Sequence, residues 1–106
     1  MFKQMLLEIV NRYNLEERSI DFFGEVLKIY SEEETEEFHQ AFGDFTSSKM
    51  NIKVKSVSFK MGNWPKCDYN HILVYIPIIY DDKHIGEHTI YYNLDGEIDD
   101  DLFVIY

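Results

Sequence analysis

The chain has 106 residues, 45% hydrophobic and 16% aromatic, enough apolar side chain to fill the core of one domain and exclude intrinsic disorder. Twenty Asp and Glu against ten Lys and Arg give a formal charge of −10, which argues against direct binding of nucleic acid. The single cysteine, Cys67, excludes an internal disulfide. The sequence shows no secretory leader and no apolar run long enough to span a bilayer, so we expect a cytoplasmic protein without a membrane partner.

The N-terminal 43 residues are expected to form two to three helices. Apolar side chains recur at helical spacing in three stretches, at 6–13, 20–30 and 38–42. Asn14 and Ser31 are each followed by a glutamate three residues later. This capping-box pattern predicts the starts of the second and third helices.

The remainder of the chain is expected to form a sheet. After a linker at 44–51, β-branched and aromatic residues dominate and turn residues punctuate them, which predicts strands near 52–61, 70–80, 84–93 and 98–106. Short connections, including the Asp95-Gly96 turn, make these strands an antiparallel meander. The expected fold is therefore α+β: one domain over residues 1–106, with the helices packed on a curled four-stranded sheet.

The strand at 70–80 is unusual because it is apolar on both faces. Such a strand is normally covered on both sides, and the helices can cover only one face of a sheet this small. Either the sheet curls around its own interior, or the second face packs on a partner or a second copy of the chain. Pro77 predicts a bulge that bends the sheet.

The charges fall into three blocks along the chain. Residues 1–43 carry ten carboxylates against four Lys or Arg, residues 44–67 carry five lysines against Asp44, and residues 68–106 carry nine carboxylates against Lys83. We expect the lysines to pair with the acidic flanks rather than to bind nucleic acid. If the first strand lies between the acidic blocks, the surface field is mild. If it lies on the opposite side, which we favour, one acidic face is left free.

No metal, cofactor or catalytic residue is assigned from the sequence. His84 and His88 share a face of a predicted strand, but they would stand about 13 Å apart at the usual rise per residue, too far for one ion. Cys67 lies near His71, but no local signature of a catalytic cysteine surrounds it. We therefore expect a binding protein and not an enzyme.

Two groups of carboxylates could form a docking face for a basic partner protein. Glu33, Glu36 and Glu37 fall on one side of the third helix, and Asp99, Asp100 and Asp101 interrupt the entry to the last predicted strand. Clustered carboxylates steer a cationic partner, and aromatic side chains beside them, here Tyr91 and Phe103, would anchor it. The sheet could also support a homodimer.

A small acidic domain with helices first and an antiparallel sheet after them resembles small bacterial immunity proteins that neutralise cationic toxins or nucleases. The resemblance covers the layout of the whole chain. It implies an inhibitor that binds the active-site region of a basic toxin through the carboxylates named above and blocks it sterically and electrostatically.

Two alternatives remain open at this point. One is a phage-type DNA mimic, in which rows of carboxylates imitate phosphates in the groove of a defence enzyme. The other is a small-ligand-binding domain or enzyme, because the layout also looks like the cystatin-like and NTF2-like architectures. His71, His88, Asp68 and Tyr75 are the candidates to line such a pocket.

Overall fold

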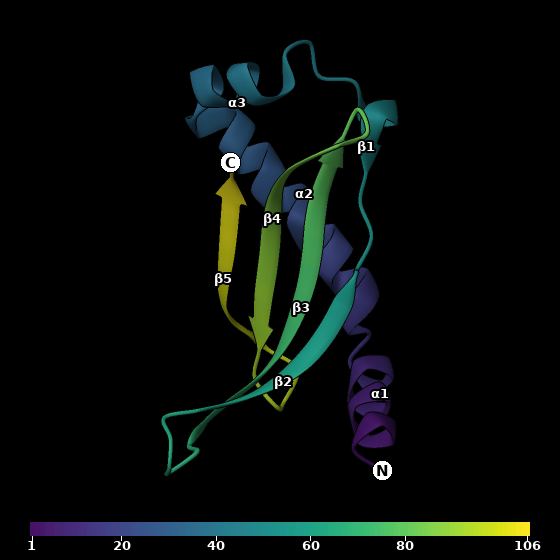
Figure 1. Ribbon diagram of the computed structural model, residues 1–106, viewed down its shortest axis with the longest axis vertical. Coiled ribbons are helices and arrows are strands. Elements are labelled where there is room, and N and C mark those ends of the chain that lie inside the picture. Colours follow the sequence, from purple (N-terminus) through teal and green to yellow (C-terminus); the bar gives the residue numbers. More distant parts are fainter.

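The computed structural model describes all residues, 1–106, as three helices followed by an antiparallel sheet (Figure 1), which confirms the α+β prediction. The helices are α1 (Phe2–Arg12), α2 (Leu15–Glu33) and α3 (Thr35–Phe42), and a short 3-10 turn, η1 (Ser47–Lys49), leads into the sheet. The strands are β1 (Met50–Asn51), β2 (Ser56–Gly62), β3 (Tyr69–Tyr80), β4 (Lys83–Tyr92) and β5 (Ile98–Ile105). None of the helices is long and apolar enough to cross a membrane.

Strand β3 is the centre of the sheet, and β4 and β5 follow it as a meander. Its other side pairs with two strands, because the predicted strand at 52–61 is divided into β1 and β2. Met50 lies opposite Tyr80 and Ser56 opposite Tyr75, so the divided side contains one residue more than β3 does over the same length.

Pro77 explains this interruption. The amide of Lys55 donates to the carbonyl of Tyr75, so Tyr75 directs its peptide groups toward β2. Successive residues of a strand alternate in this respect, and Pro77 therefore faces the same neighbour without an N–H to donate. The irregularity expected at this proline is present, and the register with β4 also shifts, between Ile78 and Ile79.

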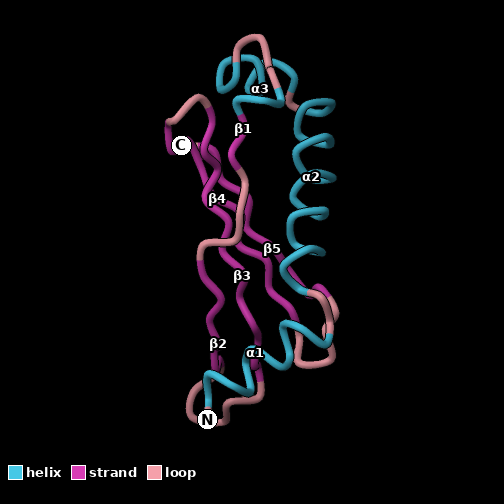
Figure 2. The backbone as a smooth tube through the Cα atoms, turned by 90° about the vertical axis from the view of Figure 1, so that its right-hand side faces the viewer, coloured by secondary structure: helices cyan, strands magenta, loops and turns pink.

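The two faces of the sheet differ in cover. On one face Ile72, Val74, Ile76 and Ile78 are completely buried against helical residues that include Leu15 and Phe23. Each such side chain contributes about 1.5–3 kcal/mol to folding. Alternate residues of β3 point to the opposite face, where they are half-buried by their neighbours within the sheet. Figure 2 shows α2 along the first face and no helix over the second, which we call the open face.

One predicted helix start is wrong. Asn14 does precede α2, but Ser31 lies inside that helix, which continues to Glu33. The Ser31 hydroxyl donates to the carbonyl of Lys28 within α2, and therefore it does not cap α3.

Helix α3 is fixed at one end of the sheet by an aromatic cluster. Phe42 and Phe45 lie 5.0 and 5.6 Å from the ring of Tyr80, and Phe38 lies 4.7 Å from Phe42. The Tyr80 hydroxyl accepts a hydrogen bond from the amide of Thr46. This packing holds α3 beside the C-terminal end of β5 (Figure 1).

The basic and acidic blocks lie on opposite edges of the sheet. The lysine-rich segment forms the β1–β2 edge and the aspartates of β5 form the other, about 14 Å away across three strand spacings. The expected pairing of lysines with the acidic flanks is wrong. The carboxylates of Asp99 and Asp101 are paired with His71 and His88, and no Lys or Arg lies within 4.0 Å of a carboxylate.

Two glycines provide a matched test of this fold. Gly96, in the β4–β5 turn, has φ +84°, and an added Cβ would clash with the Tyr13 ring. Its carbonyl accepts a hydrogen bond from Arg18, which ties the turn to α2. Gly24 lies in α2 with open space around it. We expect Gly96→Ala to lower the free energy of unfolding by at least 1–2 kcal/mol and Gly24→Ala to raise it by about 0.5–1 kcal/mol. Chemical denaturation measures both, and equal effects would contradict the packing described for the turn.

Candidate functional site

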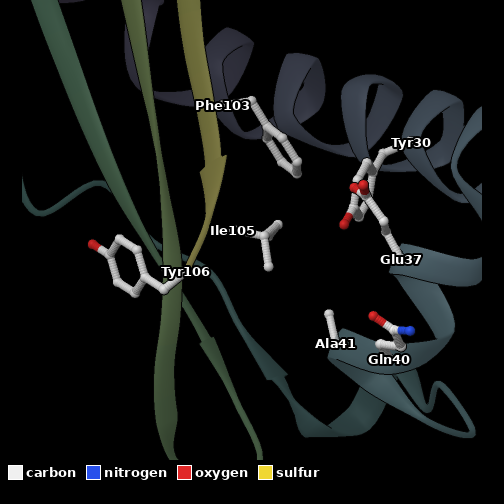
Figure 3. Close-up of a pocket in the computed structure, with 7 residues that line it drawn as sticks. All are labelled: Tyr30, Glu37, Gln40, Ala41, Phe103, Ile105 and Tyr106. Carbon is white, nitrogen blue, oxygen red and sulfur yellow. The ribbon is translucent and has the colours of Figure 1, made fainter.

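A cleft of about 540 Å³ opens between α2, α3 and the end of β5. Its lining residues are Tyr30 from α2, Glu37, Gln40 and Ala41 from α3, and Phe103, Ile105 and Tyr106 from the C-terminal end. In Figure 3, Phe103 and Ile105 point from β5 toward α2 and α3, and Tyr30 lies beside Glu37. Tyr106 points to the other side of the strand. We call this site the acidic cleft.

Local structure places these side chains on the cleft. Glu37, Gln40 and Ala41 have the spacing i, i+3 and i+4, so they share one side of α3. Phe103 and Ile105 are alternate residues of β5 and therefore share one face of the sheet, the face covered by the helices. The floor of the cleft is apolar, and its carboxylate comes from α3.

The acidic cleft carries negative charge that no cation of the chain neutralises. Burial raises the pKa of the Tyr30 hydroxyl, and the carboxylates of Glu37 and Glu34 raise it further because they disfavour a phenolate. Neither glutamate has a Lys or Arg within 4.0 Å. The cleft therefore disfavours anions and favours cations.

The chemistry of the cleft suits a cationic side chain with an aliphatic stem. The stem of a lysine or arginine can lie on Phe103 and Ile105, as such stems do on apolar surface. Its charged head can reach the carboxylate of Glu37 and the ring of Tyr30, which offers a cation–π face. No group of three or more His, Cys, Asp or Glu side chains in the chain is placed to hold a metal ion.

Two of the residues proposed from the sequence, Glu37 and Phe103, meet in the acidic cleft. Glu33 and Glu36 are exposed at the α2–α3 junction beside it. The cleft residues missed from the sequence are Tyr30, Gln40, Ala41, Ile105 and Tyr106. Tyr30 could have been predicted, because it is the last residue of the apolar stripe on the second helix. The residues of β5 beside it could not, because their position depends on the pairing of strands far apart in the sequence.

The aspartates of β5 do not join this site. Asp100 lies about 17 Å from Ile105 along the strand at the usual rise per residue. The register of β4 and β5 shifts at Tyr91/Tyr92, and the three aspartates are divided between the faces. Asp100 lies opposite Tyr91 on the open face, whereas Asp101 reaches beneath α2 to His88.

The proposed aromatic anchors are also separated. Tyr91 lies on the open face, with the Nζ of Lys60 5.6 Å from its ring. Phe103 lies on the helix-covered face, 6.3 Å from Phe23 and 5.4 Å from Tyr30. The residues proposed from the sequence therefore do not form a single docking surface.

His88 is completely buried under α2, between the rings of Phe22 and Phe23 and beside Phe103. Its Nε2 lies 2.8 Å from Oδ2 of Asp101, and its Nδ1 has no hydrogen-bond partner. Burial lowers the pKa of His88, and the Asp101 carboxylate opposes this only in part. The neutral imidazole donating from Nε2 fits this arrangement. His88 and the buried residues Ile90 and Tyr92 are alternate residues of β4. The sequence could therefore have predicted that the His88 side chain faces the core.

The four residues suggested for an NTF2-like pocket do not line a common cavity. His71 is buried on the open face, where its Nε2 lies 2.7 Å from Oδ2 of Asp99. Tyr75 shares that face, whereas His88 lies on the other. Asp68 lies in the β2–β3 loop and accepts a hydrogen bond from Asn63. The helix-covered face is filled by the apolar core.

Comparisons with known proteins add no assignment: no family model, no curated protein and no solved structure matches this chain.

The burial of His88 predicts an acid-sensitive fold. Its pKa is lower in the folded protein than the ordinary value of about 6.5 expected in the unfolded chain, so the unfolded chain binds more protons between the two values. Stability contributed by neutral His88 is complete above about pH 7 and is lost as the pH falls through that range. We expect His88→Leu to flatten the fall in the free energy of unfolding between neutral and mildly acidic pH. Parallel pH profiles of the two proteins, measured by denaturation, would contradict this.

Proposed function

We propose that this chain is an acidic protein-binding inhibitor that receives a basic side chain of its partner in the acidic cleft. The observation that carries the proposal is the pairing of Glu37 with Tyr30 over an apolar floor, with no Lys or Arg of the chain in ion-pair contact. A cationic partner would supply the missing positive charge.

The apolar floor of the cleft, and not a glutamate alone, would anchor the partner. Glu37 is exposed like Glu33 and Glu36, and an exposed ion pair contributes about 0–1 kcal/mol. The three carboxylates would mainly accelerate encounter with a basic protein. The aliphatic stem of the inserted residue would pack on Phe103 and Ile105, which are half-buried in the cleft.

The resemblance in layout to small immunity proteins supports one kind of partner, a basic toxin or nuclease domain. Insertion of a basic residue from its active-site region into the cleft would block that region sterically, and the surrounding carboxylates would repel its anionic substrate. Such an inhibitor acts in the cytoplasm and needs neither a cofactor nor nucleic acid.

The DNA-mimic alternative is less well supported. It needs rows of carboxylates that face one direction, at spacings related to those of phosphates. Two of the three adjacent aspartates of β5 are instead engaged with His71 and His88.

The direct test is binding to a candidate basic toxin or nuclease domain, with association and dissociation rates measured by surface plasmon resonance at low and high salt. We expect the association rate to fall steeply with salt. Glu37→Gln is expected to weaken binding by up to about fivefold, because an exposed ion pair contributes about 0–1 kcal/mol. Glu25→Gln, which removes an exposed charge elsewhere on α2, is the matched control and should weaken binding much less. Salt-independent binding, or equal losses in the two variants, would contradict the proposal.

A further inference from the structure

The open face of the sheet is apolar along strand β3. Leu73, Tyr75, Pro77 and Ile79 of β3 point to it and are half-buried within the sheet, and Leu102 of β5 is 52% exposed there. No helix covers this face (Figure 2), and the acidic cleft opens on the other side of the sheet. The feature predicted from the sequence, a central strand apolar on both sides, is therefore covered on one side only.

The charges on the open face are arranged at its two edges. Lys60 lies on β2 at one edge, paired with His71 in the register of β2 and β3. Asp100 lies on β5 at the other edge, opposite Tyr91. In the register Lys60 stands at the level of His71 and Asp100 at the level of Leu73, two residues apart. The Nζ of Lys60 lies 5.6 Å from the ring of Tyr91, so the side chain of Lys60 spans part of this offset.

We propose that the open face binds a second copy of this chain, in a symmetric dimer whose two-fold axis runs parallel to the strands between the two sheets. Rotation about this axis exchanges the edges, so that β2 of one copy faces β5 of the other. Lys60 of each copy then meets Asp100 of its partner, and the apolar residues of β3 meet the β4 side of the opposite sheet. The contact is isologous, so it closes at two copies.

The available area sets the strength of this dimer. All four strands β2–β5 are paired together over four rows, from Ile72 to Tyr75 of β3, and β3, β4 and β5 continue as far as Ile78. At the usual rise and strand spacing these rows cover about 400 Å² per copy, so the pair buries about 800 Å². This is smaller than a standard specific interface, and we therefore expect a weak dimer and not an obligate one.

Glu87 limits the affinity further. It lies near the centre of the open face. The pKa values of Tyr75 and Tyr106 are raised mainly by burial and, in second place, by the nearby carboxylate of Glu87. Association would take this charge out of water without a cation beside it, which is unfavourable.

Sedimentation velocity of the full chain over a micromolar to millimolar concentration series tests the dimer. We expect Lys60→Glu and Asp100→Lys each to raise the dissociation constant about tenfold or more, because each places like charges opposite one another twice. The double variant restores the attraction and should return close to the original value. Glu87→Gln should tighten the dimer.

Lys28→Glu is the matched control, since it makes the same charge change as Lys60→Glu on an exposed part of α2. A chain that stays monomeric throughout the series would overturn the proposal, as would a double variant no better than the single ones. Equal effects of Lys28→Glu and Lys60→Glu would do the same. Circular dichroism verifies that each variant is folded. Because the dimer face is separate from the acidic cleft, binding of a basic partner is expected to survive in the Lys60 and Asp100 variants, and each proposal can fail without the other.

Discussion

Strand β5 is an edge strand with one neighbour, and two buried histidines fix its position. His88 on β4 and His71 on β3 hold Asp101 and Asp99 at 2.8 and 2.7 Å, from opposite faces of the sheet. Asp99 and Asp101 are 44% and 31% exposed, so solvent screens these hydrogen bonds, and each contributes about 1 kcal/mol to holding a strand that pairs on one side only. The rest of the molecule depends on this anchoring, because β5 supplies Phe103 to the core and one wall of the acidic cleft.

The net charge of −10 is distributed unevenly, and the structure leaves most of it unpaired. Acidic and basic groups occupy opposite edges of the sheet, and no Lys or Arg reaches a carboxylate. Self-repulsion of this kind lowers stability. The acidic cleft places one of these unpaired carboxylates, Glu37, beside apolar side chains.

Local patterns predicted much of the fold. The strands at 70–80, 84–93 and 98–106 agree closely with β3, β4 and β5, because alternation and turn residues are properties of neighbours in sequence. The division of the first strand was not predicted, since it depends on Pro77, which lies on the neighbouring strand. Ser31 failed as a helix cap because a serine can also bond back to the preceding turn.

The candidate site was predictable only in part. Glu37 and Phe103 were named from the sequence, but their meeting depends on α3 packing at one end of the sheet. The three aspartates of β5 appeared as a single cluster because they are consecutive. A strand sends consecutive side chains to alternate faces, and the register shift beside Tyr92 adds to this, so two of them turn to histidines on opposite sides.

The separation of charge across the sheet gives the single chain an electric dipole directed from β5 toward β2. During diffusional encounter, such a dipole orients the molecule so that its negative edge faces a cationic partner. A dimer about an axis along the strands would reverse one of the two dipoles, and their components across the sheet would cancel. Self-association would then leave both acidic clefts open while removing the torque that orients them. The concentration of the chain would thereby change the association rate constant for the partner without changing the contacts that hold the partner in the cleft.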